Sequence, residues 1–472
     1  MSYRLAEGIQ IVEQGSAGFL FATRPLRLLR LNPPLLRLTR RLKQQSVLPS
    51  SDAEAKVLTT LASRGFAVRE WTQLGEWELP RVSIIIPVRN RPVALRDCLT
   101  SLADLDYPKS LLEVIVVDDG SNDHTPEVAR EFGAVLVDSG SIGGGPAAAR
   151  NRGALRAGGE ILAFIDSDCT ASARWLRELL PVFGDAKVAA VGGWVDGMHE
   201  AGALDRYEAV MSSLNLGRRT MFGGAGGDTF YLPSCNLLVW REAFSAVGGF
   251  RSELTVGEDV DLTWRLRDAG WSIVYLPKGA VCHAHRNRLR PFMKRRFDYG
   301  TSEGLLQRLH PVRGKTVLLP PVLAAILFLV ALSVLGCGPL PLLMGAILFA
   351  GDVLATRRRV LRQGMTLDLA AILAARGRAA ASLAYYVGYH LLRYYLVPLL
   401  LTSCFYPPVG VLVLLVLLGV ATVDHRVRRA RLFLPLFWGY YFLEQLSYGA
   451  GVFWGCLRQR TFASYKLQLQ TG

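Results

Sequence analysis

Between residues 80 and 310, short apolar runs alternate with segments of helical periodicity, and this alternation restricts the possible folds more than any other feature of the chain. The apolar runs occupy residues 82–88, 114–117, 134–137, 161–165 and 188–191, and the helical segments lie near residues 93–105, 123–131, 147–157 and 175–183. Strands that are apolar on both faces are typical of parallel sheets covered by helices on both sides. We therefore expect an α/β domain of the open, Rossmann-like class.

Polar residues follow the first two apolar runs at the points where the strands would end. The first run ends at Pro87 and Val88 and is followed by Arg89 and Asn90, and the second is followed by Asp118 and Asp119. In open α/β sheets, ligands bind outside the carboxyl ends of the strands. The two acids followed by Gly and Ser therefore suit hydrogen bonds to the base and ribose of a nucleotide, although Asp-Asp-Gly-Ser is equally typical of a solvated turn.

Two further carboxylates, Asp166 and Asp168, follow the apolar run at 161–165. At positions i and i+2 around a strand end they can turn toward one divalent cation, and Mg²⁺ or Mn²⁺ prefers oxygen ligands from carboxylates and substrate phosphates. An isolated Asp-x-Asp usually marks a loop. This one follows a buried strand and accompanies a second acidic strand end, so we expect it to bind a metal and a diphosphate.

A glycine-rich turn at residues 143–145 precedes Pro146 and an alanine-rich helix that carries Arg150 and Asn151. Because the N-terminus of a helix can receive a phosphate group, this turn is a candidate phosphate site. Arg150, one helical turn further on, is then a candidate contact to base or phosphate. The alternative is an ordinary Gly-Pro helix start with an arginine that faces solvent.

Glu258, Asp259 and Asp261 lie in the first turn of an amphipathic helix that ends at Gly270. Three acids at this position satisfy the helix macrodipole, which is a sufficient structural explanation. The functional alternative is a general base, a carboxylate that takes a proton from an acceptor hydroxyl. In either case we expect the dipole to favour the ionised carboxylate.

His283 and His285 follow a short apolar run at 273–276, and we expect their imidazoles to point to opposite sides, so that at most one completes a metal shell at Asp168. For His285 an exposed surface position is nearly as good an explanation. The arginines and lysine of residues 286–296 suit a diphosphate or an anionic lipid surface. No nucleic-acid recognition module accompanies them, so nucleic acid is not an expected partner.

The chain has 51% hydrophobic residues and a mean hydropathy of +0.25, and residues 316–456 are mostly apolar. Apolar runs at 316–336 and 340–355, and at 383–405 and 409–423, each approach the roughly 20 residues that cross a bilayer, and arginines follow each pair. The positive-inside rule makes each pair an in–out–in hairpin. Arg393 lies inside the third run, so its charged group must either extend to the membrane surface or form an ion pair. The run at 432–457 contains Glu444 and could span or lie flat; the alternative for the whole region is a buried helical bundle.

Residues 1–78 form a separate unit. Strand-like runs at 8–12 and 18–21 flank a turn at 14–16, and an arginine-rich apolar stretch at 26–33 and a helix at 52–63 follow, in the size and order of a small winged-helix module. The run at 9–12 is too short for a secretory signal. The seven scattered cysteines include no CxxC pair, so neither a disulfide framework nor a structural zinc site is expected. We expect a protein of the cytoplasmic membrane, multi-pass or tightly associated, with its catalytic domain facing the cytosol.

As a set, these motifs resemble those of family 2 glycosyltransferases, inverting enzymes of the GT-A fold that use nucleotide sugars. The resemblance covers residues 82–300 and rests on residues 82–91, 117–121, 149–151, Asp166-Ser167-Asp168 and Glu258-Asp259, in the family's order and spacing. It implies a nucleotide-sugar site of Pro87, Arg89, Asn90, Asp118, Asp119, Arg150, Asn151 and Asp166. It further implies that Asp166, Asp168 and His283 hold Mg²⁺ or Mn²⁺, and that Asp259, with Glu258 beside it, is the catalytic base.

Over nearly the whole chain, the sequence is most similar to the glycosyltransferases of mycofactocin systems, on residues 27–31, 145–151, 252–262, 284–286 and 448–451. That resemblance implies transfer of β-linked glucose from UDP-glucose to the peptide-derived redox cofactor mycofactocin. Residues 1–78 resemble, more distantly, a PqqD-like peptide-binding winged helix. Processive cellulose-type synthases carry Gln-x-x-Arg-Trp where this chain has Arg295-Arg296-Phe297, so long-chain processivity is not expected.

The sequence thus predicts three units: a PqqD-like recognition domain at 1–78, a GT-A domain at 80–310 and membrane-associated helices at 316–456. Its predicted function is metal-dependent, inverting hexosyl transfer from a UDP-sugar to a peptide-derived or glycan hydroxyl, close to membrane lipid. Two alternatives remain open at this point. One is a membrane transferase that acts on a polyprenyl phosphate or a cell-envelope glycan, and the other is a catalytically inactive, peptide-binding membrane scaffold.

Overall fold

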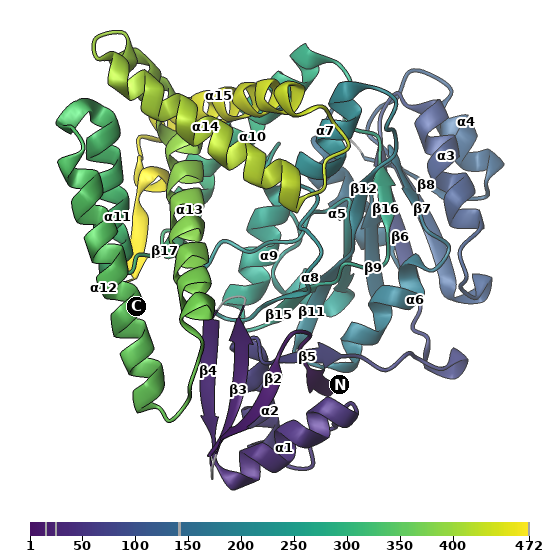
Figure 1. The fold of residues 1–472 in the computed structure, drawn as a ribbon. Helices are drawn as coiled ribbons and strands as arrows, with labels where there is room; N and C mark the ends of the chain where they lie inside the picture. Colours follow the sequence, from purple (N-terminus) through teal and green to yellow (C-terminus); the bar gives the residue numbers. More distant parts are fainter. Residues whose placement is uncertain (15–16, 24–25, 140–142, 471–472) are drawn as a thin grey trace.

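The computed structural model describes residues 1–14, 17–23, 26–139 and 143–470, arranged in three parts (Figure 1). The N-terminal part lies at the bottom of Figure 1, the central α/β part at the right, and the C-terminal helices at the left and across the top. The N-terminal elements are β1 (Ser2–Leu5), β2 (Gln10–Gln14), β3 (Ala17–Thr23), β4 (Leu26–Leu31), α1 (Pro33–Gln44), α2 (Asp52–Ser63) and β5 (Ala67–Glu70).

The N-terminal part contains the predicted hairpin. β2 pairs antiparallel with β3, with Val12 opposite Phe19, and β4 adds a third antiparallel strand. The predicted turn at 14–16 lies outside the described residues except for Gln14, which ends β2. The arginine-rich stretch forms β4 and leads into α1, and the helix at 52–63 is present as α2. Leu20, Leu42 and Leu58 meet in one buried core, so this part has an apolar centre of its own.

The central part is built on one eight-stranded sheet in the order β13-β15-β11-β14-β9-β6-β7-β8. Its strands are β6 (Val82–Val88), β7 (Leu112–Asp118), β8 (Val135–Asp138), β9 (Ile161–Ile165), β11 (Val188–Gly192), β13 (Met221–Gly223), β14 (Asn236–Trp240) and β15 (Ser272–Tyr275). Helices α3 (Pro92–Ala103), α4 (Thr125–Glu131), α5 (Gly145–Arg156), α6 (Trp175–Leu179), α8 (Arg241–Ala246) and α9 (Glu258–Asp268) accompany it. All five predicted strands and all four predicted helices are present.

The two faces of this sheet bury different residues of the same strand. Ile84 and Ile86 pack into a core with α3 and α6, whereas Ile85 packs on the other face with α5 and α8. This is why the strand sequences are apolar without alternation.

The prediction of a parallel sheet is only partly right, because the sheet is mixed. β14 runs antiparallel between β9 and β11, and β13 is antiparallel to β15 at the edge. β14 is a short strand, and α8 begins at the residue directly after it. The other strands were found because each is separated from the next by a helical segment. That spacing does not reveal β14. Between β9, β6, β7 and β8 the pairing is parallel as expected, and these strands carry the predicted motifs.

A second small sheet brings the histidine segment to the acidic strand end. β16 (Val281–His283) pairs antiparallel with β10 (Cys169–Ala171) and parallel with β12 (Val195–Gly197). In this register His283 stands opposite Cys169, directly beside Asp168. Residues more than 100 positions apart in the chain therefore share one site.

The C-terminal part consists of α11 (Pro321–Leu332), α12 (Leu340–Arg362), α13 (Leu369–Ser403), α14 (Pro407–Val427) and α15 (Leu434–Gln459). Among the described residues, α12 and α14 are long and apolar enough to cross a membrane. They contain the predicted runs at 340–355 and 409–423. The C-terminal part therefore gives weak evidence for membrane association, and the orientation of the catalytic domain stays a prediction.

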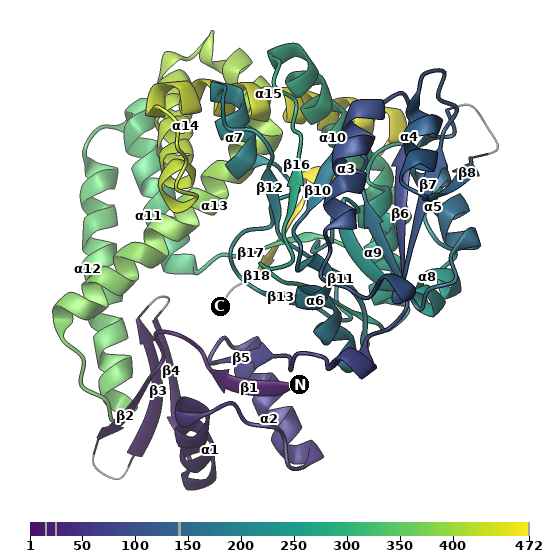
Figure 2. The ribbon, with the colours of Figure 1, turned by 90° about the vertical axis from the view of Figure 1, so that its right-hand side faces the viewer.

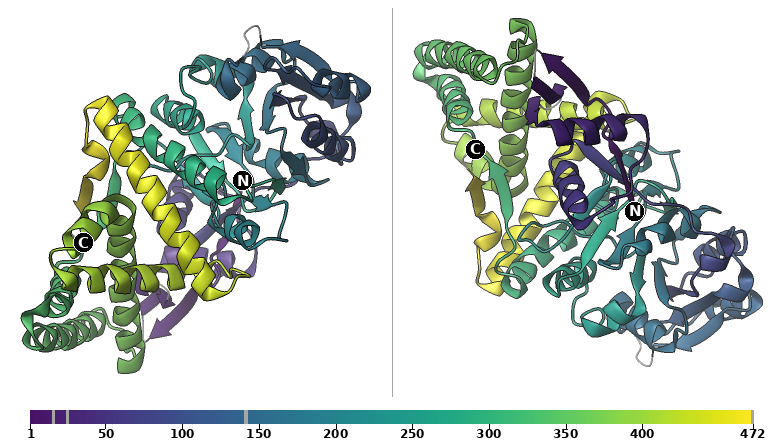
Figure 3. Two further views of the ribbon diagram at one scale, coloured as in Figure 1. Left: turned by 90° about the horizontal axis from the view of Figure 1, so that it is seen from above. Right: turned by 90° about the horizontal axis from the view of Figure 1, so that it is seen from below.

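Two of the other predicted runs differ in extent from the helices that contain them. The run at 316–336 begins in a strand, β17 (Lys315–Leu318), and its apolar helix covers 17 residues, Pro321–Cys337. The run at 383–405 belongs to the 35-residue α13, where Arg393 pairs with Glu444 at 3.3 Å, as the sequence required. The last run forms α15, which contacts α10 (Leu289–Leu309) of the central part (Figure 3).

Four glycines permit the close contact between α10 and α15. A Cβ atom at Gly300 or Gly304 of α10 would meet the backbone of α15, and one at Gly451 or Gly455 of α15 would meet the backbone of α10. Small residues four apart on facing helices let two backbones approach in this way. The helix that ends the C-terminal part is thereby fixed on the central part.

The end of the described chain returns to the same region. β18 (Leu467–Gln470) pairs parallel with β17, which lies near it in Figure 2. The pair joins the segment after α10 to the segment after α15.

Because α10 and α15 pack so closely, we expect a single added methyl group at their contact to destabilise the protein. Gly451→Ala should lower the thermal unfolding temperature of the full-length protein in detergent, because forcing extra atoms into a close-packed contact costs roughly 1–3 kcal/mol. Gly439→Ala is the matched control on the same helix, since a Cβ atom there has no neighbour within 4 Å. If both variants unfold at the same temperature as the parent, the glycine contact is not a structural requirement.

Candidate active site

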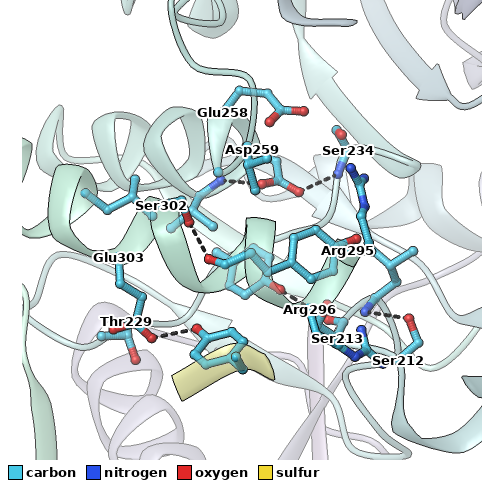
Figure 4. Close-up of a pocket in the computed structure, with 18 of the residues that line it drawn as sticks. Ser212, Ser213, Thr229, Ser234, Glu258, Asp259, Arg295, Arg296, Ser302 and Glu303 are labelled. Carbon is cyan, nitrogen blue, oxygen red and sulfur yellow. Dashed lines mark hydrogen bonds between the residues drawn. The ribbon is translucent and has the colours of Figure 1, made fainter. Parts of the chain in front are cut away.

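A cavity of about 1050 Å³ opens at the carboxyl ends of β6, β7 and β9 and extends to the C-terminal helices. Figure 4 shows part of its lining. The predicted site residues that line it are Pro87, Arg89, Asp119, Arg150, Asp166, Asp168, Glu258, Asp259 and His283. Asn90, Asp118 and Asn151 are not among the lining residues.

Asn90 and Asp118 shape the turns that follow β6 and β7. Asn90 has a left-handed backbone with φ of 51°, its N–H donates to Ser121 Oγ at 2.9 Å, and its side-chain oxygen accepts from the Asn122 N–H at 2.9 Å. Asp118 accepts from the Ser121 N–H at 3.1 Å. The two residues thus hold together the loops at adjacent strand ends. They lie behind the residues that line the cavity.

Asp119 holds the glycine-rich turn. Its two carboxylate oxygens accept from the N–H groups of Gly144 and Gly145, at 2.9 and 3.0 Å. Gly143 has a φ of +73°, and a Cβ atom there would lie 2.7 Å from a guanidinium nitrogen of Arg89. The glycines before Pro146 therefore let the turn fold onto Asp119 and leave room for Arg89.

Arg150 is buried and bridges two acids from different elements. Its guanidinium donates to Asp166 at 2.5 Å and to Glu258 at 3.0 Å. The alternative of a solvent-facing arginine is therefore wrong. The neighbouring Asn151 instead bonds both backbone groups of Phe250, at 2.7 and 2.8 Å, and so fixes the loop before α9.

Asp168 lies beside an arginine and a histidine. Arg91 forms an ion pair with it, and His283 Nε2 lies 3.6 Å from Asp168 Oδ1. Burial opposes ionisation of Asp168, but His283 and Arg91 hold the pKa of this carboxyl below its usual value. Asp166 is not part of this cluster; its carboxylate is paired with Arg150.

The Asp168 cluster fits a divalent cation. Among the described residues, ligand atoms of Asp168, Cys169 and His283 lie within 4.8 Å of one another. Burial raises the pKa of the Cys169 thiol well above its usual value, so this thiol stays protonated and is a poor ligand. His283 Nδ1 is buried without a hydrogen-bond partner in the described structure. A carboxylate and an imidazole then remain, which suit Mn²⁺ or Mg²⁺ if substrate oxygens complete the shell.

The two histidines lie together, contrary to the expectation from sequence. Their rings stack with centroids 4.8 Å apart, because alternate residues of an extended segment project to the same side. His285 lies 3.9 Å from Glu208 and its side chain is 7% exposed, so an exposed surface position is excluded.

Asp259, at the start of α9, faces the same cavity (Figure 4). Its carboxylate accepts from the N–H groups of Ser234 at 3.3 Å and Val260 at 2.8 Å. Burial, with Glu258 next to it, nevertheless raises the pKa of Asp259 to about 7. The expectation that the helix dipole would favour the ionised form is therefore outweighed by burial, and the group is suited to exchange a proton near neutral pH.

The sequence did not identify several residues that line the cavity, and it indicated the arginines and lysine of residues 286–296 only as one basic segment. Arg286, Arg295 and Arg296 of the basic segment all line the cavity, and Arg296 forms an ion pair with Glu208 at 2.6 Å. Hydroxyl groups from three other segments complete the lining: Ser212, Ser213, Thr229, Tyr231, Tyr299 and Ser302. No motif marked these residues, because isolated serines and tyrosines occur in any surface loop.

Comparison with known proteins agrees with this geometry. Residues 83–248 match the family model described as glycosyl transferase family 2. The chain is 34% identical over 410 residues to the pre-mycofactocin glycosyltransferase of Mycobacterium tuberculosis (strain ATCC 25618 / H37Rv), which covers 83% of this chain and 82% of that protein. The chain belongs to glycosyltransferase family 2. It is therefore a glycosyltransferase, with the GT-A-like α/β domain of that family.

Other relatives share mainly the catalytic part. The glycosyltransferase AglE of Haloferax volcanii is 33% identical over 239 residues, which are 48% of this chain and 73% of that protein. Among solved structures, the mannosyltransferase PcManGT from Pyrobaculum calidifontis, in complex with GDP-Man and Mn²⁺, matches with 20% identity and a TM-score of 0.39. That match covers 73% of this chain and 90% of the mannosyltransferase.

Proposed function

We propose that this glycosyltransferase moves glucose from UDP-glucose to an acceptor hydroxyl, with inversion at the anomeric carbon, and that it requires Mg²⁺ or Mn²⁺. The observation that carries the proposal is one cavity that contains both a cation-compatible cluster, Asp168 with His283, and a separate carboxyl, Asp259, with a pKa of about 7. Inverting transfer needs these two functions, charge neutralisation at a diphosphate and a base at the acceptor.

The donor would lie along the strand ends. Pro87 and Asp119 line the end at which the base and ribose would bind, with Asp118 and Asn90 behind them. Arg89, Arg286 and Arg295 line the cavity and have no carboxylate within salt-bridge distance in the described part of the chain, so they remain available to a diphosphate. Asp166, with Arg150, would complete this end.

The acceptor reaction is a single displacement. The acceptor oxygen attacks the anomeric carbon from the face opposite to the diphosphate, Asp259 takes the hydroxyl proton, and the bond from the anomeric carbon to the diphosphate oxygen breaks as UDP leaves. Glu258 is held by Arg150 and supports Asp259 by position rather than by proton transfer. A divalent cation held by Asp168 and His283, with Asp166 nearby, would stabilise the charge on the leaving diphosphate.

The acceptor is proposed from the relative's name, pre-mycofactocin glycosyltransferase, and from the N-terminal part. We propose that residues 1–78 are a PqqD-like domain that recognises a peptide-derived acceptor, that residues 80–310 form the catalytic domain, and that the product carries β-linked glucose. The helices of residues 316–456 would place the enzyme at the cytoplasmic membrane, with the catalytic domain in the cytosol.

Membership of the family argues against the alternative of an inactive scaffold. An acceptor on a polyprenyl phosphate or a cell-envelope glycan is the second candidate. The exposed apolar residues of α12 and α14 favour it, because they would bring the enzyme to the lipid phase.

Removal of the Asp168 carboxylate should abolish metal-dependent donor binding. For Asp168→Ala we expect UDP affinity to fall by roughly tenfold to 100-fold in the presence of Mn²⁺, and to lose its dependence on Mn²⁺. The measurement is titration calorimetry with and without the ion. Asp196→Ala, on the neighbouring β12 but outside the cavity lining, should bind UDP like the parent. Unchanged Mn²⁺-dependent binding by the Asp168 variant would contradict the assignment.

The base role of Asp259 predicts a defined pH profile. Because the reactive form is ionised and the pKa is about 7, kcat/KM should rise about tenfold per pH unit below 7 and level off above it. Asp259→Asn should lower kcat by roughly 100-fold or more and leave UDP binding nearly intact. Asp298→Asn, a carboxylate of α10 outside the cavity lining, is the control. Turnover of the Asp259 variant within threefold of the parent would exclude this role.

The class of acceptor can be tested by following which product receives radiolabelled glucose. The full-length protein is incubated with radiolabelled UDP-glucose, Mn²⁺ and an extract that contains both peptide-derived and lipid-linked acceptors, and the products are separated by solvent extraction. We expect label in the aqueous, peptide-derived fraction. Label only in the lipid fraction would support the second candidate instead, and Asp259→Asn is the control for background transfer.

A further inference from the structure

The two helix hairpins of the C-terminal part end in segments that contain no charged residue. Residues 333–340 join α11 to α12, and residues 402–408 join α13 to α14; we call these two segments the hairpin tips. The tips lie side by side, because α14 contacts residues 333–337 and the Tyr406 hydroxyl donates to the Leu335 carbonyl. In Figure 1 they lie at the upper left, away from the central part.

Large apolar side chains of the tips and of the adjoining helical turns are exposed. Phe405 is 90% exposed, and Leu340 and Leu401 are 64% and 63% exposed. The adjoining turns of α12 and α14 add the exposed residues Leu343, Met344, Ile347, Val411, Leu414 and Leu415. Single exposed apolar residues are ordinary, whereas a contiguous apolar surface marks the site of a partner.

Polar groups of the tips are bonded within the protein. The side-chain hydroxyls of the tips all donate to backbone carbonyls: Ser333 to Gly338 at 2.6 Å, Thr402 to Pro398 at 2.9 Å, Ser403 to Leu400 at 2.6 Å, and Tyr406 to Leu335. The N–H groups of Phe405 and Tyr406 donate to the Thr402 carbonyl, at 3.0 and 2.9 Å. Hydrocarbon contains no water that could satisfy such groups, so a segment that enters it needs partners of this kind.

Charged residues begin at a similar distance from the tips on two of the helices. Asp352 lies 12 residues after the start of α12, and Arg393 lies 10 residues before the end of α13. Asp352 pairs with Arg376 at 2.6 Å, and Arg393 with Glu444 at 3.3 Å. At 1.5 Å per residue, the charge-free lengths are about 15–18 Å. The hydrocarbon core of a bilayer is about 30 Å thick, so these lengths match one leaflet.

The helix ends that point away from the tips are covered by protein. Leu417 and Val420 of α14 are buried in a core with residues of α13 and α15, and Arg428, directly after α14, donates to the Val210 carbonyl of the central part at 2.6 Å. Val360 of α12 packs against β3 of the N-terminal part. In Figure 1, α12 and α14 run in different directions. The two helices therefore do not share one direction along which both could cross a bilayer.

We propose that the hairpin tips insert together into one leaflet of a lipid bilayer and that neither hairpin crosses it. This inference rests on the proposed function, which places the enzyme at the cytoplasmic membrane. The partner is the hydrocarbon of the leaflet next to the catalytic part. The exposed arginines of α12 and α14, Arg357, Arg358, Arg359 and Arg426, lie farther from the tips than the two ion pairs, on the side of the anionic headgroups.

The depth of the tips can be measured with two cysteines of the chain itself. Cys337 and Cys404 lie in the two tips, and both are exposed. Sealed membrane vesicles of either orientation, with the full-length protein, are treated with a charged, membrane-impermeant maleimide, and each cysteine is read by peptide mass spectrometry. We expect neither to react in either orientation and both to react after unfolding in dodecyl sulfate. Arg358→Cys, on α12, is the control and should react only in inside-out vesicles.

Either kind of reaction at the tips would overturn the proposal. Labelling in right-side-out vesicles would show that the hairpins cross the bilayer, and labelling in inside-out vesicles would show that the tips lie in water. A second measurement is needed because a second copy of the chain could also protect the cysteines.

A charge at the tips should weaken membrane binding. For Phe405→Asp we expect partition into vesicles of phosphatidylethanolamine and phosphatidylglycerol to fall by roughly tenfold to 100-fold, because a carboxylate must enter hydrocarbon. Leu155→Asp, at an 82% exposed position on α5, is the matched control and should partition like the parent. Unchanged partition of Phe405→Asp, or conversion of a dimer to a monomer instead, would contradict insertion. Both variants should bind UDP like the parent; failure of the parent to bind UDP would overturn the proposed function and not the membrane contact.

Discussion

The contact between α10 and α15 determines how the catalytic part and the C-terminal helices form one molecule. Glycines on both helices bring the backbones together, and a buried ion network lies beside them: Arg296 of α10 is 2.6 Å from Glu208 and 3.7 Å from Glu444 of α15. Glu444 in turn pairs with Arg393 of α13 and accepts from Tyr207. Charges buried at this depth are tolerated only when each is paired. The network therefore requires α7 (Ala203–Met211), α10, α13 and α15 to be present together.

The site shows how one fold assigns different tasks to its carboxylates. Asp118 and Asp119 bind backbone N–H groups and hold loops, and Glu258 and Asp166 are bound by Arg150. Neighbouring cationic groups lower the pKa of Asp168, whereas burial raises the pKa of Asp259 to about 7. The chemistry assigned to each acid follows from what contacts it, and the residue type alone does not distinguish them.

Much of the catalytic part could be predicted from the sequence, because its strands are buried on both faces and its motifs stand at strand ends. The positions of β6 and β9 follow directly from this pattern. The antiparallel β14 could not be predicted in the same way, since strand direction leaves no trace in an apolar run. The inner role of Asn90, Asp118 and Asn151 also depends on turn geometry that a motif does not encode. In the C-terminal third, hydropathy predicted α12 and α14, but it could not separate them from α15, whose Glu444 forms ion pairs inside the protein.

The parallel pairing of β17 with β18 has a consequence for how the enzyme is made. Residues of this pair, including Lys315 and Gln468, line the catalytic cavity, although the predicted catalytic residues all precede residue 284. During translation the last acidic motif, at residues 258–261, is therefore synthesised more than 200 residues before β18 is complete at residue 470. A chain that ended before residue 467 would contain every predicted catalytic group and still lack part of the cavity lining.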